Sequence, residues 1–130
     1  KTAFFSVISG GKHIPAHKGL FKGIIRSHLG LIIPGKEGDC RMRVANQVYP
    51  WKPGKVLVFD DTYDHEVWNT TDQTRVVLLL DVERPFRPPF SWANRGIIRA
   101  ITGSSYVKEA QEKHEQWEAE FHRNLRQISA

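Results

Sequence analysis

The 130-residue chain is 40% hydrophobic and carries a formal net charge of +5 at pH 7, a length that suits one hydrophobic core and excludes two domains of ordinary size. Its single cysteine, Cys40, excludes an internal disulfide and a cysteine-based zinc cluster, and it favours a reducing compartment. No apolar run reaches the roughly 18 residues of a membrane-spanning helix, and the sequence has neither RNA-binding aromatic motifs nor Cys/His fingers, which argues against nucleic acid as a partner.

Short strand-like runs, separated by turn residues, fill the first two thirds of the chain. Pro34-Gly35 and Pro53-Gly54 are typical of the turns between them. Many short strands at this spacing predict a mainly β fold, a sandwich or jelly roll, and argue against an α/β sheet. The clearest runs are 3–8, 22–33, 40–49, 55–60, 65–69 and 74–82.

The character of the sequence changes after the last of these runs. A proline-rich piece at 84–89 ends the sheet, and helices are predicted near 91–101 and 106–127, the second with one apolar stripe. We therefore expect a β core over 1–87 and a helical extension over 88–130 that packs on or beside it. Because a strand begins almost at Lys1, which is not a methionine, the core is compatible with truncation at its N-terminus.

Alternation along the strand-like runs gathers polar residues on single faces. Arg26, His28 and Gly30 share one face of their run, and the opposite face is apolar and suited to a core. Arg41 and Arg43 likewise flank an apolar residue and share a face. If the strands close into a roll, these faces can line one cavity.

The run over 74–82 repeats the pattern, with Arg75 on one face and a wholly apolar opposite face. A guanidinium on a buried strand is a natural bidentate partner for a carboxylate. His28 and His65 lie on separate runs, and neutral imidazole suits iron as a ligand. The spacing of two among six histidines does not by itself distinguish a metal pair from two unrelated residues.

Several long motifs between His13 and Arg87 together resemble the aspartyl/asparaginyl β-hydroxylases, a branch of the iron(II)/2-oxoglutarate oxygenases. They occur in the family's order and span more than half of the chain. The matching segments are His17-Lys18-Gly19, Arg26–Pro34, Cys40–Asn46, Trp51–Lys55 and Phe59–Asn69.

This resemblance implies a double-stranded β-helix, the cupin-like jelly roll, and a dioxygenase that uses Fe(II), 2-oxoglutarate and O2 to hydroxylate an unactivated carbon. By position, His28 and His65 resemble the catalytic iron ligands. Arg75 resembles the residue that pairs with the distal carboxylate of 2-oxoglutarate, Arg43 a second cosubstrate-binding arginine, and Arg41 a substrate-binding residue.

The resemblance departs from the broader oxygenase superfamily at Gly30, where most members place a carboxylate ligand. This branch is similar in having glycine there, with two histidines and solvent completing the metal's coordination. Asp61 and Asp64 remain alternative metal ligands. Gly30, the short length and the abrupt start also keep open a second hypothesis, a non-catalytic jelly-roll module that binds a metal or ligand.

A narrower likeness concerns the substrate. Leu80–Arg87 and the basic segment after it resemble bacterial lipid hydroxylases of this family, which hydroxylate an acyl chain of lipid A or of a related amino lipid. The expected substrate is thus a peptide or lipid with an anionic group. Residues 1–58 contain ten Lys and Arg against two acids, so an anionic partner is favoured, and a solvated basic face is the alternative.

Location and assembly are expected from the same features. We expect a cytoplasmic protein, with peripheral contact to the inner face of an anionic membrane, and a homo-oligomer is compatible with the sequence. The contact would use Arg84, Arg87, Arg95 and Arg99, which could equally be ordinary surface charges.

Overall fold

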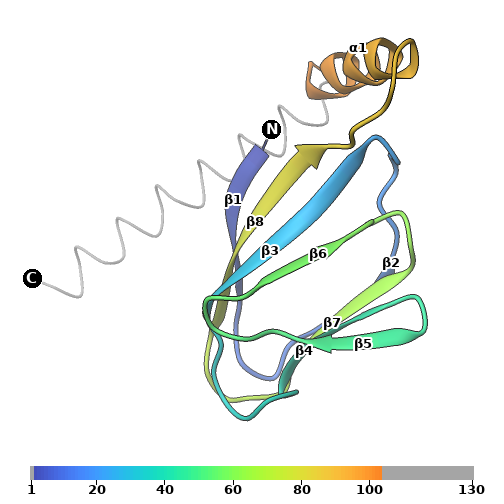
Figure 1. Ribbon diagram of the computed structural model, residues 1–130. Helices are drawn as coiled ribbons and strands as arrows, with labels where there is room; N and C mark the ends of the chain where they lie inside the picture. The colour runs from blue at the N-terminus through green and yellow to red at the C-terminus, as the bar shows by residue number, and fades with distance from the viewer. Residues whose placement is uncertain (1, 104–130) are drawn as a thin grey trace, which may run out of the picture. The chain divides into compact units, whose positions relative to one another are not determined.

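A computed structural model describes residues 2–103 of the chain. By its internal contacts the chain divides into two compact units, residues 1–85 and 86–130. The first unit contains all the described strands and the second contains the described helix (Figure 1). These elements are β1 (Thr2–Ile8), β2 (His13–His17), β3 (Ile24–Ile32), β4 (Cys40–Val44), β5 (Gln47–Pro50), β6 (Val56–Phe59), β7 (His65–Asn69), β8 (Arg75–Glu83) and α1 (Phe90–Thr102).

The strands of the first unit form two four-stranded antiparallel sheets. One sheet has the order β1-β8-β3-β6 and the other the order β2-β7-β4-β5. Strands that are neighbours in a sheet are mostly distant in sequence, so the chain crosses repeatedly from one sheet to the other. This is the jelly roll, and the predicted fold class is confirmed.

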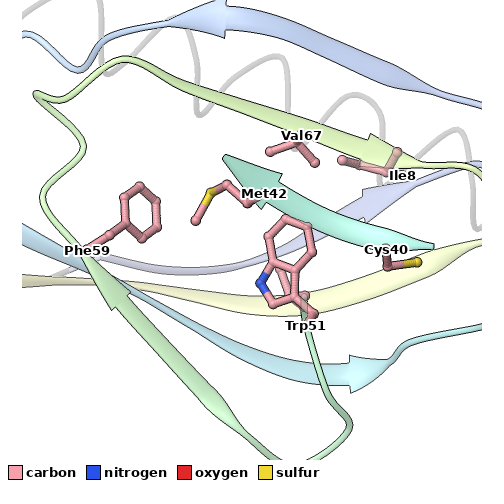
Figure 2. Close-up of a cluster of buried hydrophobic side chains, with 7 residues drawn as sticks. Ile8, Cys40, Met42, Trp51, Phe59 and Val67 are labelled. Atoms are coloured by element: carbon pink, nitrogen blue, oxygen red, sulfur yellow. The ribbon is translucent and has the colours of Figure 1, made fainter. Parts of the chain in front are cut away.

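The hydrophobic core of this unit takes residues from both sheets (Figure 2). Met42 of β4 and Val77 of β8 are fully buried, and Trp51, which follows β5, is 3% exposed. Side chains from several strands therefore meet in one interior, as a jelly roll requires. The core comprises Ile8, Cys40, Met42, Trp51, Phe59, Val67 and Val77.

The faces of β3 and β8 that carry His28 and Arg75 turn inward, as predicted for strands that close into a roll, whereas the opposite apolar faces, which were expected to form the core, turn outward. Alternation correctly grouped Arg26 with His28 and set them apart from the apolar face, but the apolar face is not the core. His28 pairs with Leu79 in the interior, whereas the opposite face of the same sheet exposes large apolar side chains. Phe5 is 61% exposed and Val58 is 58% exposed. Period two tells which residues share a face, and it does not tell which face turns inward when both are largely apolar.

The strands differ from the prediction in two places. The run over 40–49 is a hairpin of β4 and β5, whose turn contains Ala45 with a φ of 51°. The segment Ala45-Asn46-Gln47 has turn chemistry, so the sequence indicated this turn, although the run was expected to extend over 40–49. Strand β2 was not predicted at all. All five of its residues are exposed, and it therefore lacks the alternation that marks a half-buried strand.

The second unit contains α1, which confirms the predicted helix near 91–101. The predicted helix near 106–127 and its apolar stripe lie outside the described residues. Over residues 2–103, no helix is both long and apolar enough to cross a membrane.

Candidate functional site

A cavity of about 90 Å³ lies in the interior of the first unit, lined by side chains from both sheets. It brings together three residues that the sequence singled out: His28 from β3, His65 from β7 and Arg75 from β8. The rest of its lining is mostly apolar. The structure thus places the two predicted metal ligands and the predicted carboxylate-binding arginine around one space.

His28 is buried with unsatisfied nitrogens. It is 6% exposed, and neither Nδ1 nor Nε2 has a hydrogen-bond partner within the described residues. Burial, together with the positive charges of Arg75 and Arg26, lowers the pKa of His28 to about 3. The imidazole is therefore neutral near pH 7 and offers a lone pair that the described residues do not use, which is the state a metal ligand requires.

Trp51 and Phe59 enclose this ring. The indole of Trp51 stacks on His28 with ring centroids 5.8 Å apart, and Phe59 meets it edge-on at 5.0 Å. Two aromatic neighbours fix the orientation of an imidazole that has no hydrogen bond to hold it.

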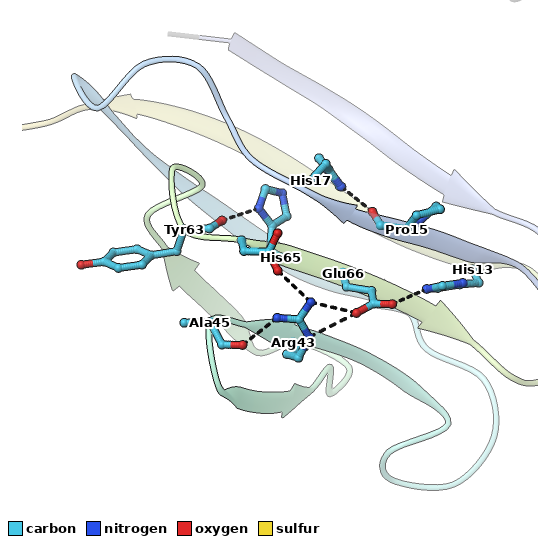
Figure 3. Close-up of polar contacts among 9 residues, drawn as sticks. His13, Pro15, His17, Arg43, Ala45, Tyr63, His65 and Glu66 are labelled. Carbon is cyan, nitrogen blue, oxygen red and sulfur yellow. Dashed lines mark hydrogen bonds and ion pairs between the residues drawn. The ribbon is translucent and has the colours of Figure 1, made fainter.

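A hydrogen bond to a backbone carbonyl orients the imidazole of His65. It is 4% exposed, and its Nδ1 lies 2.9 Å from the carbonyl oxygen of Tyr63 (Figure 3). Because a carbonyl only accepts, Nδ1 carries the proton and Nε2 carries the lone pair of the neutral ring. Burial also lowers the pKa of His65. This support of one nitrogen by a carbonyl is the usual arrangement behind a metal-binding histidine.

His17 is a cavity residue to which the sequence assigned no role. It lies on β2 with its ring centroid 4.2 Å from that of His65, and its Nδ1 donates to the carbonyl of Pro15 at 2.8 Å. Its strand has no alternation, so only its place in the quoted family motif could have drawn attention to it.

Arg75 is a buried cation whose partners are all neutral. It is 1% exposed, its Nη2 donates to the hydroxyl of Ser6 at 2.9 Å, and its guanidinium lies 4.5 Å from the ring centroid of Trp51. Its Nε has no partner, and it forms no ion pair with a described residue. Burial lowers the pKa of Arg75 to about 10, which still leaves the group charged at pH 7. A buried charge in this state is costly unless an anion joins it.

Arg26 also lines the cavity, but carboxylates of the protein already engage its charge. Its Nε and Nη2 donate to the two oxygens of Asp81 at 2.8 and 3.2 Å, and Nη1 lies 3.4 Å from Asp61. Asp61 is 3% exposed, and burial is the main cause of its raised pKa. Neither Asp61 nor Asp64, the alternative metal ligands, is among the cavity-lining residues.

The structure does not bring Arg43 and Arg41 to the cavity. Met42 lies between them and points into the core, so alternation turns both arginines to the outer face of β4. There Arg43 pairs with Glu66 and Asp64, each at 2.9 Å (Figure 3). Their predicted contacts with cosubstrate and substrate find no support in this placement.

On the same outer face, Arg41 donates to the carbonyl of Gly38 at 2.9 Å and lies 5.1 Å from the ring centroid of Trp68. Trp68 pairs with Arg41 in the register of β4 and β7 and lies on the face of β7 opposite to that of His65.

Gly30 is where the superfamily's carboxylate ligand would be, and the backbone leaves no room for one. A Cβ at Gly30 would lie 2.4 Å from the carbonyl oxygen of Lys52 and 3.1 Å from Cγ1 of Ile33. Hydrogen bonds fix this approach, since Gly30 N donates to Lys55 O at 3.0 Å and Gly54 N donates to Gly30 O at 2.8 Å. Among the described residues, no group of three His, Cys, Asp or Glu side chains is arranged to hold a metal ion.

We expect Gly30→Ala to lower the free energy of unfolding by about 1–3 kcal/mol, because the methyl group must displace the backbone near Lys52. Chemical denaturation measures this change. Gly96→Ala is the matched control, because a Cβ there meets nothing within 4 Å and alanine suits a helix. Equal stability of Gly30→Ala and the unmodified protein would contradict the close approach.

The buried neutral His28 gives an expected dependence of stability on pH. Its pKa is about 3 in the folded protein and about 6.5 when unfolded, so below pH 6.5 the unfolded chain binds the extra proton. The free energy of unfolding of the metal-free protein should therefore fall between about pH 6.5 and pH 3, by an amount on the order of 4 kcal/mol. Denaturation curves across this range measure the slope, and His28→Gln should flatten it. An unchanged slope in that variant would refute this origin.

The first unit of the chain matches a known protein family. The sequence model described as Aspartyl/Asparaginyl beta-hydroxylase matches residues 1–85. The chain belongs to the aspartyl/asparaginyl β-hydroxylase family. The matched residues coincide with the first compact unit, which contains the cavity.

Two similar proteins show how much of their length the chain matches. The ornithine lipid ester-linked acyl 2-hydroxylase of Rhizobium tropici is 44% identical over 121 residues, which cover 93% of this chain and 43% of that protein. The human aspartyl/asparaginyl beta-hydroxylase is 42% identical over 85 residues, covering 65% of this chain and 11% of that protein. The chain thus spans less than half the length of either relative.

A solved structure supports the fold alone. The cupin domain of an XRE-family transcriptional regulator from Enterobacter cloacae superimposes with a TM-score of 0.52 at 17% identity, covering 65% of this chain and 81% of that one. This likeness agrees with the jelly roll described above.

Proposed function

We propose that the protein is an iron(II)- and 2-oxoglutarate-dependent hydroxylase that acts on the acyl chain of an amino-acid-containing lipid. One observation carries the proposal: Arg75, a buried guanidinium that no carboxylate among residues 2–103 engages, lines the same small cavity as His28 and His65. The residues fit the two groups, because neutral imidazoles suit iron and a guanidinium suits the far carboxylate of a diacid.

In this proposal His28 and His65 hold the iron, and Arg75 with Ser6 holds the distal carboxylate of 2-oxoglutarate. When bound, the metal and cosubstrate supply the oxidation, in which O2 and 2-oxoglutarate give succinate, CO2 and one oxygen atom for the substrate. The protein supplies orientation and a dry site. The Tyr63 carbonyl keeps the proton of His65 on Nδ1, and Trp51 keeps the Arg75 guanidinium in place.

The apolar lining favours an acyl chain as the substrate. Ile14, Val67 and Leu79 present only hydrocarbon to the cavity, and a peptide aspartate would leave its carboxylate beside an arginine whose charge Asp81 already engages. The extent of the similarity supports the same choice. The match to the lipid hydroxylase covers 93% of this chain, against 65% for the aspartyl/asparaginyl enzyme.

We further propose that the protein works in the cytoplasm, in peripheral contact with an anionic membrane surface. The second unit offers the required side chains, with Phe90 70% and Trp92 68% exposed on α1. Exposed Arg87 and Arg99 lie on the same unit. Aromatic residues beside arginines suit the boundary between lipid head groups and acyl chains.

The test measures succinate from the purified protein with Fe(II), 2-oxoglutarate and air. One arm contains vesicles with an acylated ornithine lipid, a second contains a peptide with a central aspartate, and a third contains neither. Succinate formed in proportion to the hydroxylated acyl chain supports the proposal. Hydroxylated aspartate without lipid product would assign the peptide substrate instead. Stoichiometric iron without succinate in any arm would indicate a non-catalytic binding module.

A further inference from the structure

One aromatic ring of the cavity wall contacts both candidate metal ligands. Phe59, the last residue of β6, is 8% exposed and lines the cavity. Its ring centroid lies 5.0 Å from that of His28 and 5.4 Å from that of His65, with interplanar angles of 87° and 61°. Among the described residues, no other ring has a recorded contact with both imidazoles.

A ring in this position is exposed to the oxidation that the site directs at its substrate. An oxidising equivalent produced in a dry cavity reacts with whatever C–H bond lies within reach, and a bound acyl chain normally presents that bond. When no substrate is bound, the C–H bonds within reach are those of the side chains that line the cavity. The ring that contacts both imidazoles is the wall group most directly exposed.

We propose that Phe59 is a site of self-hydroxylation when the protein turns over without substrate, an inference that rests on the proposed function. O2 is the oxidant and 2-oxoglutarate the two-electron reductant. One oxygen atom enters an aryl C–H bond of Phe59 to give C–OH, which keeps the hydrogen count of the ring. The other enters succinate as 2-oxoglutarate loses CO2. The product is a phenol between the two ligand histidines.

Two side chains of the same core cluster, Met42 and Trp51, compete with Phe59 for this oxidation (Figure 2). Met42 lines the cavity with an oxidisable thioether and belongs to the same core cluster as Phe59, so it is the main competitor. Trp51 stacks on His28 only, does not line the cavity, and has the cationic guanidinium of Arg75 over its ring at 4.5 Å. A cation on its face makes that indole a poorer electron donor.

The experiment incubates the full chain with Fe(II), 2-oxoglutarate and air, without lipid, and analyses the tryptic peptides by tandem mass spectrometry. Phe59 falls in fragment 56–75, whereas Met42 falls in another fragment. We expect a gain of one oxygen atom on Phe59 that comes from isotopically labelled O2, requires 2-oxoglutarate and decreases when substrate lipid is added. Phe59→Leu should abolish the gain in this fragment.

Fragment 56–75 also contains the internal control. Tyr63 is 53% exposed, so oxidants that diffuse in solution should mark it before the buried Phe59. Oxygen on Tyr63 or Met42 with none on Phe59 overturns the inference, as does a gain on Phe59 that persists without 2-oxoglutarate. Succinate formation with Phe59 unchanged refutes this inference and leaves the proposed function standing, whereas no consumption of 2-oxoglutarate refutes both.

Discussion

Arg75→Met should weaken 2-oxoglutarate binding by about 30-fold or more, because truncating one partner of a buried charge pair costs roughly 2–5 kcal/mol. Arg75 is the one cation of the cavity that no carboxylate of the described residues engages, and methionine keeps its length without its charge. Isothermal titration with 2-oxoglutarate, in the presence of a redox-inert divalent metal, measures the loss. Hydroxylation should fall with it.

The same substitution should leave the ligand-free protein at least as stable. Arg75 is buried with only neutral partners, and replacing a buried charge by a well-packed apolar side chain is often neutral or stabilising. Arg43→Met is the matched control. Its arginine pairs with Glu66 and Asp64 on the outer face, so 2-oxoglutarate affinity should change little. Equal losses from both variants would contradict the placement of Arg75 and Arg43.

His65→Gln should abolish stoichiometric metal binding, with an affinity loss greater than the roughly 10- to 100-fold that follows removal of a supporting partner alone. With His65 gone, one of the two proposed ligands, His28, remains. Titration with Fe(II) under anaerobic conditions, or with a redox-inert ion, measures the affinity. Hydroxylation and self-oxidation should disappear together.

His13→Gln is the control for this experiment. His13 donates to Glu66 and stacks on Trp68, with its ring centroid 5.3 Å away, on the face that carries Arg43 (Figure 3). Its loss should not change metal affinity. Retention of tight metal binding by His65→Gln would show that the ion lies elsewhere.

The fold was predictable because turn residues and short alternating runs recur along the first unit. Alternation also grouped Arg26 with His28 correctly. It correctly predicted that the polar faces line a cavity, but it wrongly assigned the core to the apolar faces, since the interior of this roll holds buried polar groups such as Arg75 and His28. Sequence rules fail at functional sites for this reason, because polar residues are kept inside at a cost to stability.

The arginines of β4 also show that alternation groups residues by face without indicating which face turns outward. Arg41 and Arg43 share a face as predicted, but only the burial of Met42 between them fixes that face as the outer one. No local feature of the sequence indicates which face of this strand is the outer one. Likewise, His17 belongs to a family motif without an assigned role, and its contact with His65 arises from the pairing of β2 with β7, which are distant in sequence.

The close backbone approach at Gly30 has a consequence for the order in which ligands accumulate. Without a carboxylate there, two neutral imidazoles would leave a divalent ion with its full charge, close to the cation of Arg75. A dianion that touches both would relieve this repulsion, so each ligand should tighten the other by the same factor. Metal affinity measured without 2-oxoglutarate would then understate the affinity in a cell, and occupancy of the site would follow the supply of the 2-oxo acid.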